Sequence, residues 1–110
     1  MDYIFEKSWN DTVSRISEGF GEKLDYAAIL FLIGLQELGQ TDRTFKKDEK
    51  LSLMHIAICT LLEPYGYYRF QGRDEEGWPH FERIEEIPAL APTDQELLIR
   101  KAIVNYFRES

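Results

Sequence analysis

Apolar residues recur along the first part of the chain at the three- and four-residue spacing of a helix. Five of them form one narrow face together with Thr12: Phe5, Trp9, Val13, Ile16 and Phe20. This periodicity predicts an amphipathic helix over about residues 2–19, with Asp2 as its N-cap. Gly19 and Gly21 are expected to end it, because glycine accepts the left-handed conformation that is common after a helix.

The next two predicted helices, about residues 25–38 and 46–63, are apolar on almost every side. A helix of this kind must be covered from most directions, either by its own chain or by a partner. The sequence therefore predicts that these two helices form a central pair. Gly34 is small enough to allow a neighbouring element to approach closely.

A different pattern follows, in which aromatic and polar residues alternate loosely on both sides of a turn near residues 73–77. It predicts a β-hairpin over about residues 66–84, with Pro79 confined to an edge or a strand start. Thr93 and Glu96 then stand in capping-box spacing and predict a last helix over about residues 93–108. We expect one mainly α domain over residues 1–110, a four-helix arrangement with a short β-hairpin between the third and fourth helices.

Composition narrows the classes of function. Hydrophobic residues make up 44% of the chain and aromatic residues 14%, which is enough for a packed core. The net charge of −7 and the sequence pI of about 4.8 disfavour nucleic acid as a partner, because phosphate binding needs lysine and arginine.

The expected compartment follows from two features of the sequence. The longest apolar run, residues 26–35, is shorter than the roughly 20 residues that span a bilayer, so we expect no membrane association. The sequence opens without a basic and then apolar leader, and Cys59 is the one cysteine. A secreted small domain usually has several paired cysteines, so a cytoplasmic location is expected.

Candidate chemistry gathers on the third predicted helix. A polar stripe at intervals of three and four residues is made of Ser52, His55, Cys59 and Glu63, and Asp48 extends it by one turn. His55 and Cys59 could bind a metal, or His55 could activate the Cys59 thiol. A zinc site would need further ligands, and the only other histidine is His80. The simpler interpretation, a polar helix side with a small buried cysteine, is favoured.

The hairpin supplies a second set of candidates, since aromatic residues beside arginine are common in binding surfaces. They are Tyr67, Tyr68, Arg69, Phe70, Arg73, Trp78 and His80. The same residues would also serve to dock a short hairpin on a helical core, and docking is the favoured interpretation. The acidic run 74–76 does not have the spacing of a calcium-binding loop, so it is interpreted as a solvated turn.

No run of residues is specific enough to identify a family, so function is predicted only by class. The favoured hypothesis is a non-enzymatic protein-interaction module that binds either a protein partner or a second copy of itself as a homodimer, without metal or cofactor. The alternative is a small metal- or thiol-dependent enzyme that uses His55 and Cys59. A winged-helix DNA binder is a more remote alternative, because the third helix lacks a basic face.

Overall fold

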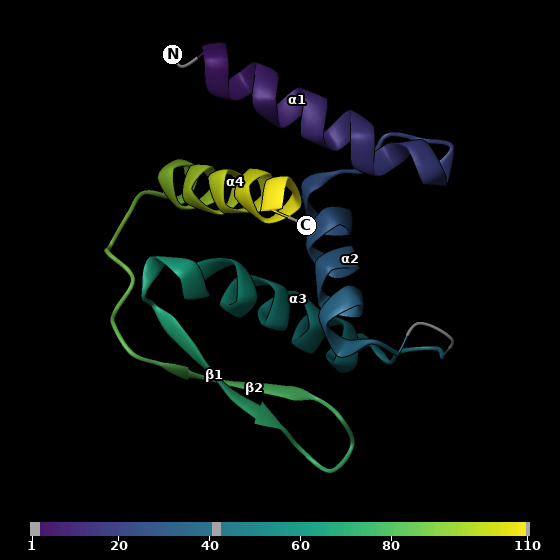
Figure 1. The fold of residues 1–110 in the computed structure, drawn as a ribbon, viewed down its shortest axis with the longest axis vertical. Helices are drawn as coiled ribbons and strands as arrows, with labels where there is room; N and C mark the ends of the chain where they lie inside the picture. Colours follow the sequence, from purple (N-terminus) through teal and green to yellow (C-terminus); the bar gives the residue numbers. More distant parts are fainter. Residues whose placement is uncertain (1–2, 41–42, 110) are drawn as a thin grey trace. The chain divides into compact units, whose positions relative to one another are not determined.

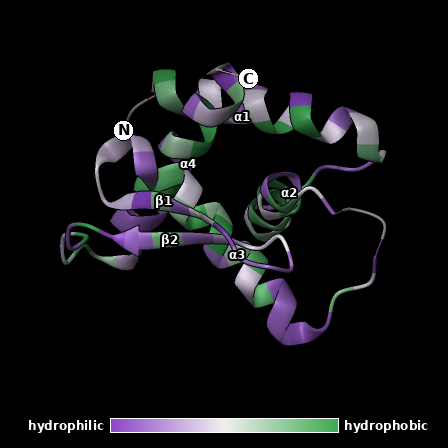
Figure 2. Ribbon diagram, turned by 60° about the horizontal axis from the view of Figure 1, so that its bottom comes forward, coloured by the Kyte–Doolittle hydropathy of each residue, from purple (hydrophilic) through white to green (hydrophobic). Residues whose placement is uncertain are grey.

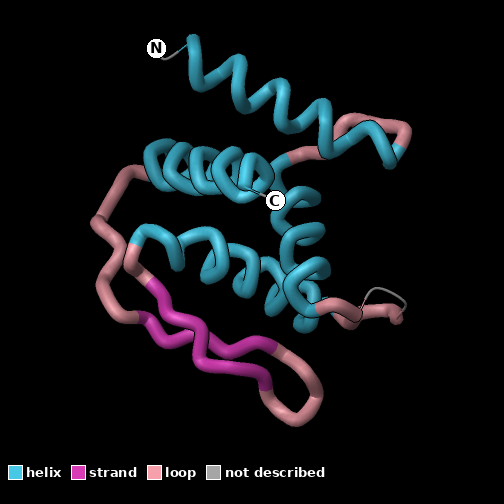
Figure 3. Tube along the Cα trace, in the orientation of Figure 1, coloured by secondary structure: helices cyan, strands magenta, loops and turns pink. Residues whose placement is uncertain are grey.

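The protein is described here from a computed structural model that covers residues 3–40 and 43–109 (Figures 1 and 3). Within those residues the chain forms four α-helices and one two-stranded antiparallel hairpin, so the predicted fold class is confirmed. The elements are α1 (Tyr3–Ser17), η1 (Glu18–Phe20), α2 (Tyr26–Leu38), α3 (Lys47–Leu62), η2 (Glu63–Tyr65), β1 (Tyr68–Arg73), β2 (Pro79–Arg83) and α4 (Pro92–Glu109).

The helix ends differ from the predicted ones in small ways that have local causes. After α1 the chain tightens into the 3₁₀ turn η1 and then leaves through Gly21, which has a φ of 74°. Phe20 was expected on the buried face of the first helix, but this tighter turn leaves it 52% exposed. The predicted N-cap Asp2 lies outside the described residues.

The predicted capping box of the last helix was wrong. The helix α4 begins at Pro92, where proline is well tolerated, so Thr93 lies inside the first turn instead of preceding it. Glu96 forms an ion pair with Arg100 at 2.9 Å. A glutamate caps the start of α3 in the way that was expected for the last helix. There Glu49 Oε1 accepts the backbone N–H of the N-cap residue Lys46 at 2.9 Å.

The described chain divides into two compact units, one from residues 1–25 with 89–110 and one from residues 26–88. In the first unit α1 pairs with α4. The Arg100 guanidinium lies 4.9 Å from the centre of the Trp9 ring, and Lys101 Nζ lies 5.7 Å from that of Phe5. Single-domain behaviour of the whole chain stays a prediction.

In the second unit α2 packs against α3, as the central pair of the prediction requires. The contact is closest at Gly34, where an added Cβ would stand 2.2 Å from the backbone oxygen of Leu53. The apolar residues of both helices are largely buried. Figure 2 shows hydrophobic residues, in green, along α2 and the middle of α3. Leu51, at 62% exposure, is the main exception.

The hairpin rests on α3, and its register was not predictable from the sequence. Phe70 pairs with Phe81 and Gly72 pairs with His80, so Gln71 is an extra residue that bulges from β1. Gly72 has a φ of 109°, which a residue with a side chain rarely adopts. Pro79 opens β2, which agrees with its expected place at a strand start.

The side chains that hold the hairpin belong to one cluster. Its buried members are Leu38, Phe45, Leu53 and Ile56, and partly buried Phe31, Leu35, Trp78 and Phe81 pack against them. Since Trp78 and Phe81 come from the hairpin, burying them attaches it to the helices. No helix in the described part of the chain is both long and apolar enough to cross a membrane.

We predict that Gly34→Ala destabilises the protein. In an open helix this change would stabilise by roughly 0.5–1 kcal/mol, but here the new methyl group meets the Leu53 backbone, which cannot rotate away. The expected result is a loss of about 2 kcal/mol or more in the free energy of unfolding. Urea denaturation followed by circular dichroism would measure it.

Gly19→Ala is the matched control, because an added Cβ there would have nothing within 4 Å. Its unfolding midpoint should stay close to that of the wild type. Equal stability of Gly34→Ala and the wild type would mean that the two helices do not approach each other as described.

Candidate functional site

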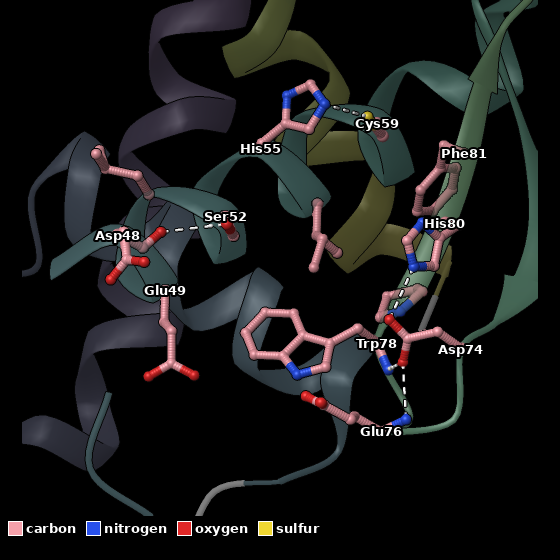
Figure 4. Close-up of a pocket in the computed structure, with 13 residues that line it drawn as sticks. Asp48, Glu49, Ser52, His55, Cys59, Asp74, Glu76, Trp78, His80 and Phe81 are labelled. Carbon is pink, nitrogen blue, oxygen red and sulfur yellow. Dashed lines mark hydrogen bonds and ion pairs between the residues drawn. The ribbon is translucent and has the colours of Figure 1, made fainter. Parts of the chain in front are cut away.

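An open cleft of about 650 Å³ lies between one side of α3 and the turn and second strand of the hairpin (Figure 4). Both walls belong to the unit of residues 26–88. The α3 wall consists of Asp48, Glu49, Leu51, Ser52, His55, Ile56 and Cys59. The hairpin wall consists of Asp74, Glu76, Trp78, Pro79, His80 and Phe81.

The polar stripe predicted on the third helix forms much of the α3 wall. Ser52, His55 and Cys59 all line the cleft, together with Asp48 one turn earlier. Their spacing of three and four residues places them on one side of the helix. Glu63, the C-cap residue of α3, does not line the cleft.

Glu63 has a structural contact of its own. Its Oε2 atom accepts the backbone N–H of Phe70 at 2.8 Å, and so ties the end of α3 to the strand β1. It also borders a second cavity of about 240 Å³, which Thr60, Arg73 and Phe81 line as well.

His55 and Cys59 contact each other at the upper part of the α3 wall, as Figure 4 shows. The distance from His55 Nε2 to Cys59 Sγ is 3.5 Å. Cys59 is only 1% exposed, and burial raises the pKa of its thiol to about 11. The sulfur is therefore protonated at neutral pH, which is the opposite of an activated cysteine, whose pKa is lowered.

Asp74 organises the opposite wall. Its Oδ1 atom accepts the backbone N–H groups of Glu76 and Trp78, at 3.0 and 2.9 Å, and so shapes the turn. Its Oδ2 atom lies 2.9 Å from His80 Nε2. The hydrogen bond from His80, followed by that from the Trp78 backbone, lowers the pKa of the Asp74 carboxyl.

The three candidates for chemistry, His55, Cys59 and His80, thus line one cleft but belong to two separate pairs. His55 contacts Cys59, whereas His80 contacts Asp74. Over residues 3–40 and 43–109 no three His, Cys, Asp or Glu side chains gather in a way that could hold a metal ion. The cleft therefore has hydrogen-bonding groups on both sides, on α3 and on the hairpin.

Two aromatic side chains, Trp78 and Phe81, belong to the apolar lining of the cleft and pack against neighbouring rings. Trp78 meets Phe45 edge to face, with ring centroids 6.4 Å apart at 90°, and Phe81 meets Phe70 at 5.6 Å. A cation already stands at this aromatic cluster. The Arg43 guanidinium lies 4.7 Å from the ring centre of Phe45 and 5.8 Å from that of Trp78, and it pairs with Glu49.

Other candidates from the hairpin have partners within the chain. Arg73 donates to the backbone oxygens of Glu37 and Leu38, the latter at 3.2 Å, at the C-terminal end of α2. Those carbonyls have no acceptor role inside the helix, and a cation is favoured there. Arg73 also donates to Gly77 O at 2.8 Å, so it fastens the hairpin turn to α2.

The remaining predicted binding residues lie on β1 or just before it, outside the cleft lining. Arg69 pairs with Glu82 of the facing strand at 2.6 Å. Tyr68 meets the His55 ring edge to face, with centroids 6.4 Å apart. Tyr67 is half-buried, and Phe70 stays 45% exposed.

Four carboxylates line the cleft, and two of them have charged or hydrogen-bonded partners. Glu49 pairs with Arg43, and Asp74 pairs with His80. Among the described residues no ion pair involves the carboxylates of Asp48 or Glu76. The cleft therefore carries an excess of negative charge beside its aromatic surface.

Of the hairpin wall, the sequence had singled out Trp78 and His80 as candidate binding residues, but not Asp74 or Glu76. Asp74 and Glu76 were interpreted as part of a solvated turn. They face α3 only because the hairpin docks where it does, so no local pattern could have identified them. Comparisons with protein-family models, with curated proteins and with solved structures found no match to this chain.

We predict that the protein loses stability as the pH falls below the usual carboxyl range, near 4, and that Asp74→Asn reduces this loss. In the folded protein the pKa of Asp74 lies below its usual value, so the ionised carboxylate stabilises the fold. This stabilisation is complete above the pKa that Asp74 has in the unfolded chain, and it is lost as the pH falls through the lower pKa of the folded protein. Glu49 acts in the same direction, because the Lys46 backbone N–H and Arg43 lower its pKa.

Urea midpoints measured at neutral and acidic pH would test this prediction. Asparagine keeps an oxygen for the turn but has no charge to lose, so the variant should show the flatter pH dependence. Glu75→Gln, next in the chain but outside the cleft, serves as control and should behave like the wild type. Identical pH profiles for all three proteins would contradict the assigned role of Asp74.

Proposed function

We propose that this chain is a non-enzymatic protein-interaction module and that the cleft between α3 and the hairpin is its binding surface. The observation that carries the proposal is the lining of the cleft, where exposed polar groups converge around a partly buried indole, Trp78. Binding sites combine an apolar surface with a few polar groups that fix orientation, and tryptophan is frequent at their centres.

The volume of the cleft supports the same proposal. At about 650 Å³ it lies within the range of roughly 300–1,000 Å³ that is typical of ligand sites, which is room for a few side chains. Leu51 stands at its edge with most of its surface exposed, and a bound partner would cover it.

A partner other than a second copy is favoured. The expectation of a homodimer arose from the apolar surfaces of α2 and α3, and their residues are largely covered within the chain. DNA is disfavoured as a partner, because the polar side of α3 lines an acidic cleft that would repel phosphate. A single free cysteine suits a reducing compartment, and the cytoplasm is the location we propose.

Panning a random peptide display library on the wild type and on two variants would test the proposal. Ser52→Trp places a large ring on the exposed α3 wall and should obstruct the cleft. Ser14→Trp makes the same change on an exposed position of α1, outside the cleft. We expect peptides that bind the wild type and Ser14→Trp, and that bind Ser52→Trp at least about tenfold more weakly.

The opposite outcome is equally clear. If every enriched peptide binds Ser52→Trp as well as the wild type, the cleft is not the binding surface. If the panning enriches no peptide, the interaction proposal loses its support.

The thiol-enzyme alternative leads to a separate prediction about Cys59. With a pKa of about 11, its thiolate fraction at pH 7 is on the order of one in ten thousand, so alkylation by iodoacetamide should be slow. The rate should rise steadily up to about pH 11, and His55→Ala should leave it nearly unchanged. The chain has one cysteine, so mass spectrometry reports this site alone.

Denatured protein at the same pH provides the reference rate for an accessible thiol. Alkylation of the folded protein at neutral pH that is faster than this reference, and slowed by His55→Ala, would favour the enzyme hypothesis over ours.

A further inference from the structure

We propose that the cleft accepts a lysine or arginine side chain from an extended segment of the partner protein, with apolar residues beside it. This inference rests on the proposed function and names the chemistry of the partner. It follows from the charge of the walls, from the aromatic groups between them, and from the way in which the protein already holds one of its own cations.

The charge of the cleft favours a cationic group. Asp48 extends from α3 and Glu76 from the hairpin turn, so carboxylates approach the cleft from both walls (Figure 4). Neither takes part in an ion pair within residues 3–40 and 43–109. A cation between the walls would gain from both, and the excess charge of the whole chain, −7, acts in the same direction.

The aromatic part of the cleft suits the same group. In Figure 4 the Trp78 indole extends from the hairpin wall toward the α3 wall. Tryptophan offers the best face for a cation–π contact, within about 6 Å of the ring centre. Lysine and arginine have apolar stems as well, which could lie along Ile56 and Phe81 while the charged end meets the carboxylates.

Arg43 shows this mode of binding inside the protein. Its guanidinium stands over Phe45 and near Trp78, and pairs with Glu49 at the edge of the cleft. One aromatic ring and one carboxylate therefore already hold one cation. Trp78 is also 5.8 Å from Arg43, whereas the carboxylates of Asp48 and Glu76, which line the same cleft, have no ion-pair partner among the described residues.

A side chain matches the cleft better than a bare metal ion. Calcium and magnesium take six or more oxygen ligands at close range, and no such group is assembled among the described residues. A cleft of about 650 Å³ with exposed Leu51 at its edge has room for the neighbours of the charged residue as well. We therefore commit to a peptide with apolar residues on both sides of its cation.

Three short peptides would test the proposal on the full chain. They are acetyl-Leu-Lys-Leu-amide and the same peptide with norleucine or glutamate in the middle, so that length and apolar flanks stay constant. The readout is the indole N–H signal of Trp78 in ¹H–¹⁵N spectra. The chain has two tryptophans, and Trp9, buried in the other unit, serves as the internal reference.

We expect the lysine peptide to shift the Trp78 signal and to bind about tenfold more tightly than the norleucine peptide, with no binding of the glutamate peptide. The preference should shrink as salt is raised, because charges at an open cleft are screened. The double variant Asp48→Asn/Glu76→Gln should lose the preference. The double variant Glu75→Gln/Glu85→Gln removes as much charge from the same unit outside the cleft lining, and should keep it.

Different failures have different meanings. Equal binding of the lysine and norleucine peptides in the cleft would overturn the cationic assignment and leave the interaction module intact. Cadaverine binding as tightly as the lysine peptide would replace the protein partner with a small amine. If the lysine peptide leaves Trp78 unmoved while panning still yields cleft-dependent peptides, the cationic inference fails alone.

Discussion

A two-stranded hairpin has little stability of its own, so the cleft depends on what holds this hairpin against α3. Trp78 and Phe81 pack on the cluster built around Leu53 and Ile56, which removes apolar surface from water. Arg73 supplies a directional contact by donating to the last carbonyl groups of α2. Together these contacts fix the distance between the two walls, and with it the size of the cleft.

The same hairpin residues therefore stabilise the fold and line the candidate site. Trp78 is only partly buried, because one part of its ring meets Phe45 while another faces the cleft. Asp74 has a similar double role, since one oxygen shapes the turn and the other holds His80. A site on a supported hairpin of this kind is preorganised, which lowers the entropy lost when a partner binds.

The chemistry of the cleft separates the two main hypotheses. Burial keeps the Cys59 thiol protonated, and His80 contacts Asp74 instead of the thiol. The carboxylates of Asp48 and Glu76 are different, because they combine negative charge with an open approach. A cationic partner would be attracted by the excess negative charge of the cleft. For this reason binding is the function that we propose.

The sequence by itself determined the helices, the hairpin and the polar stripe on α3, because each depends on the spacing of residues that are near in the chain. It also indicated Gly34 as a point of close approach. It could not determine the hairpin register, the contact of Arg73 with α2, or the second wall of the cleft. Asp74, Trp78 and Glu76 meet the α3 stripe only after the hairpin docks, and docking is decided by packing between segments that are distant in sequence. The tertiary structure alone therefore turned a helical stripe and an acidic turn into one candidate site.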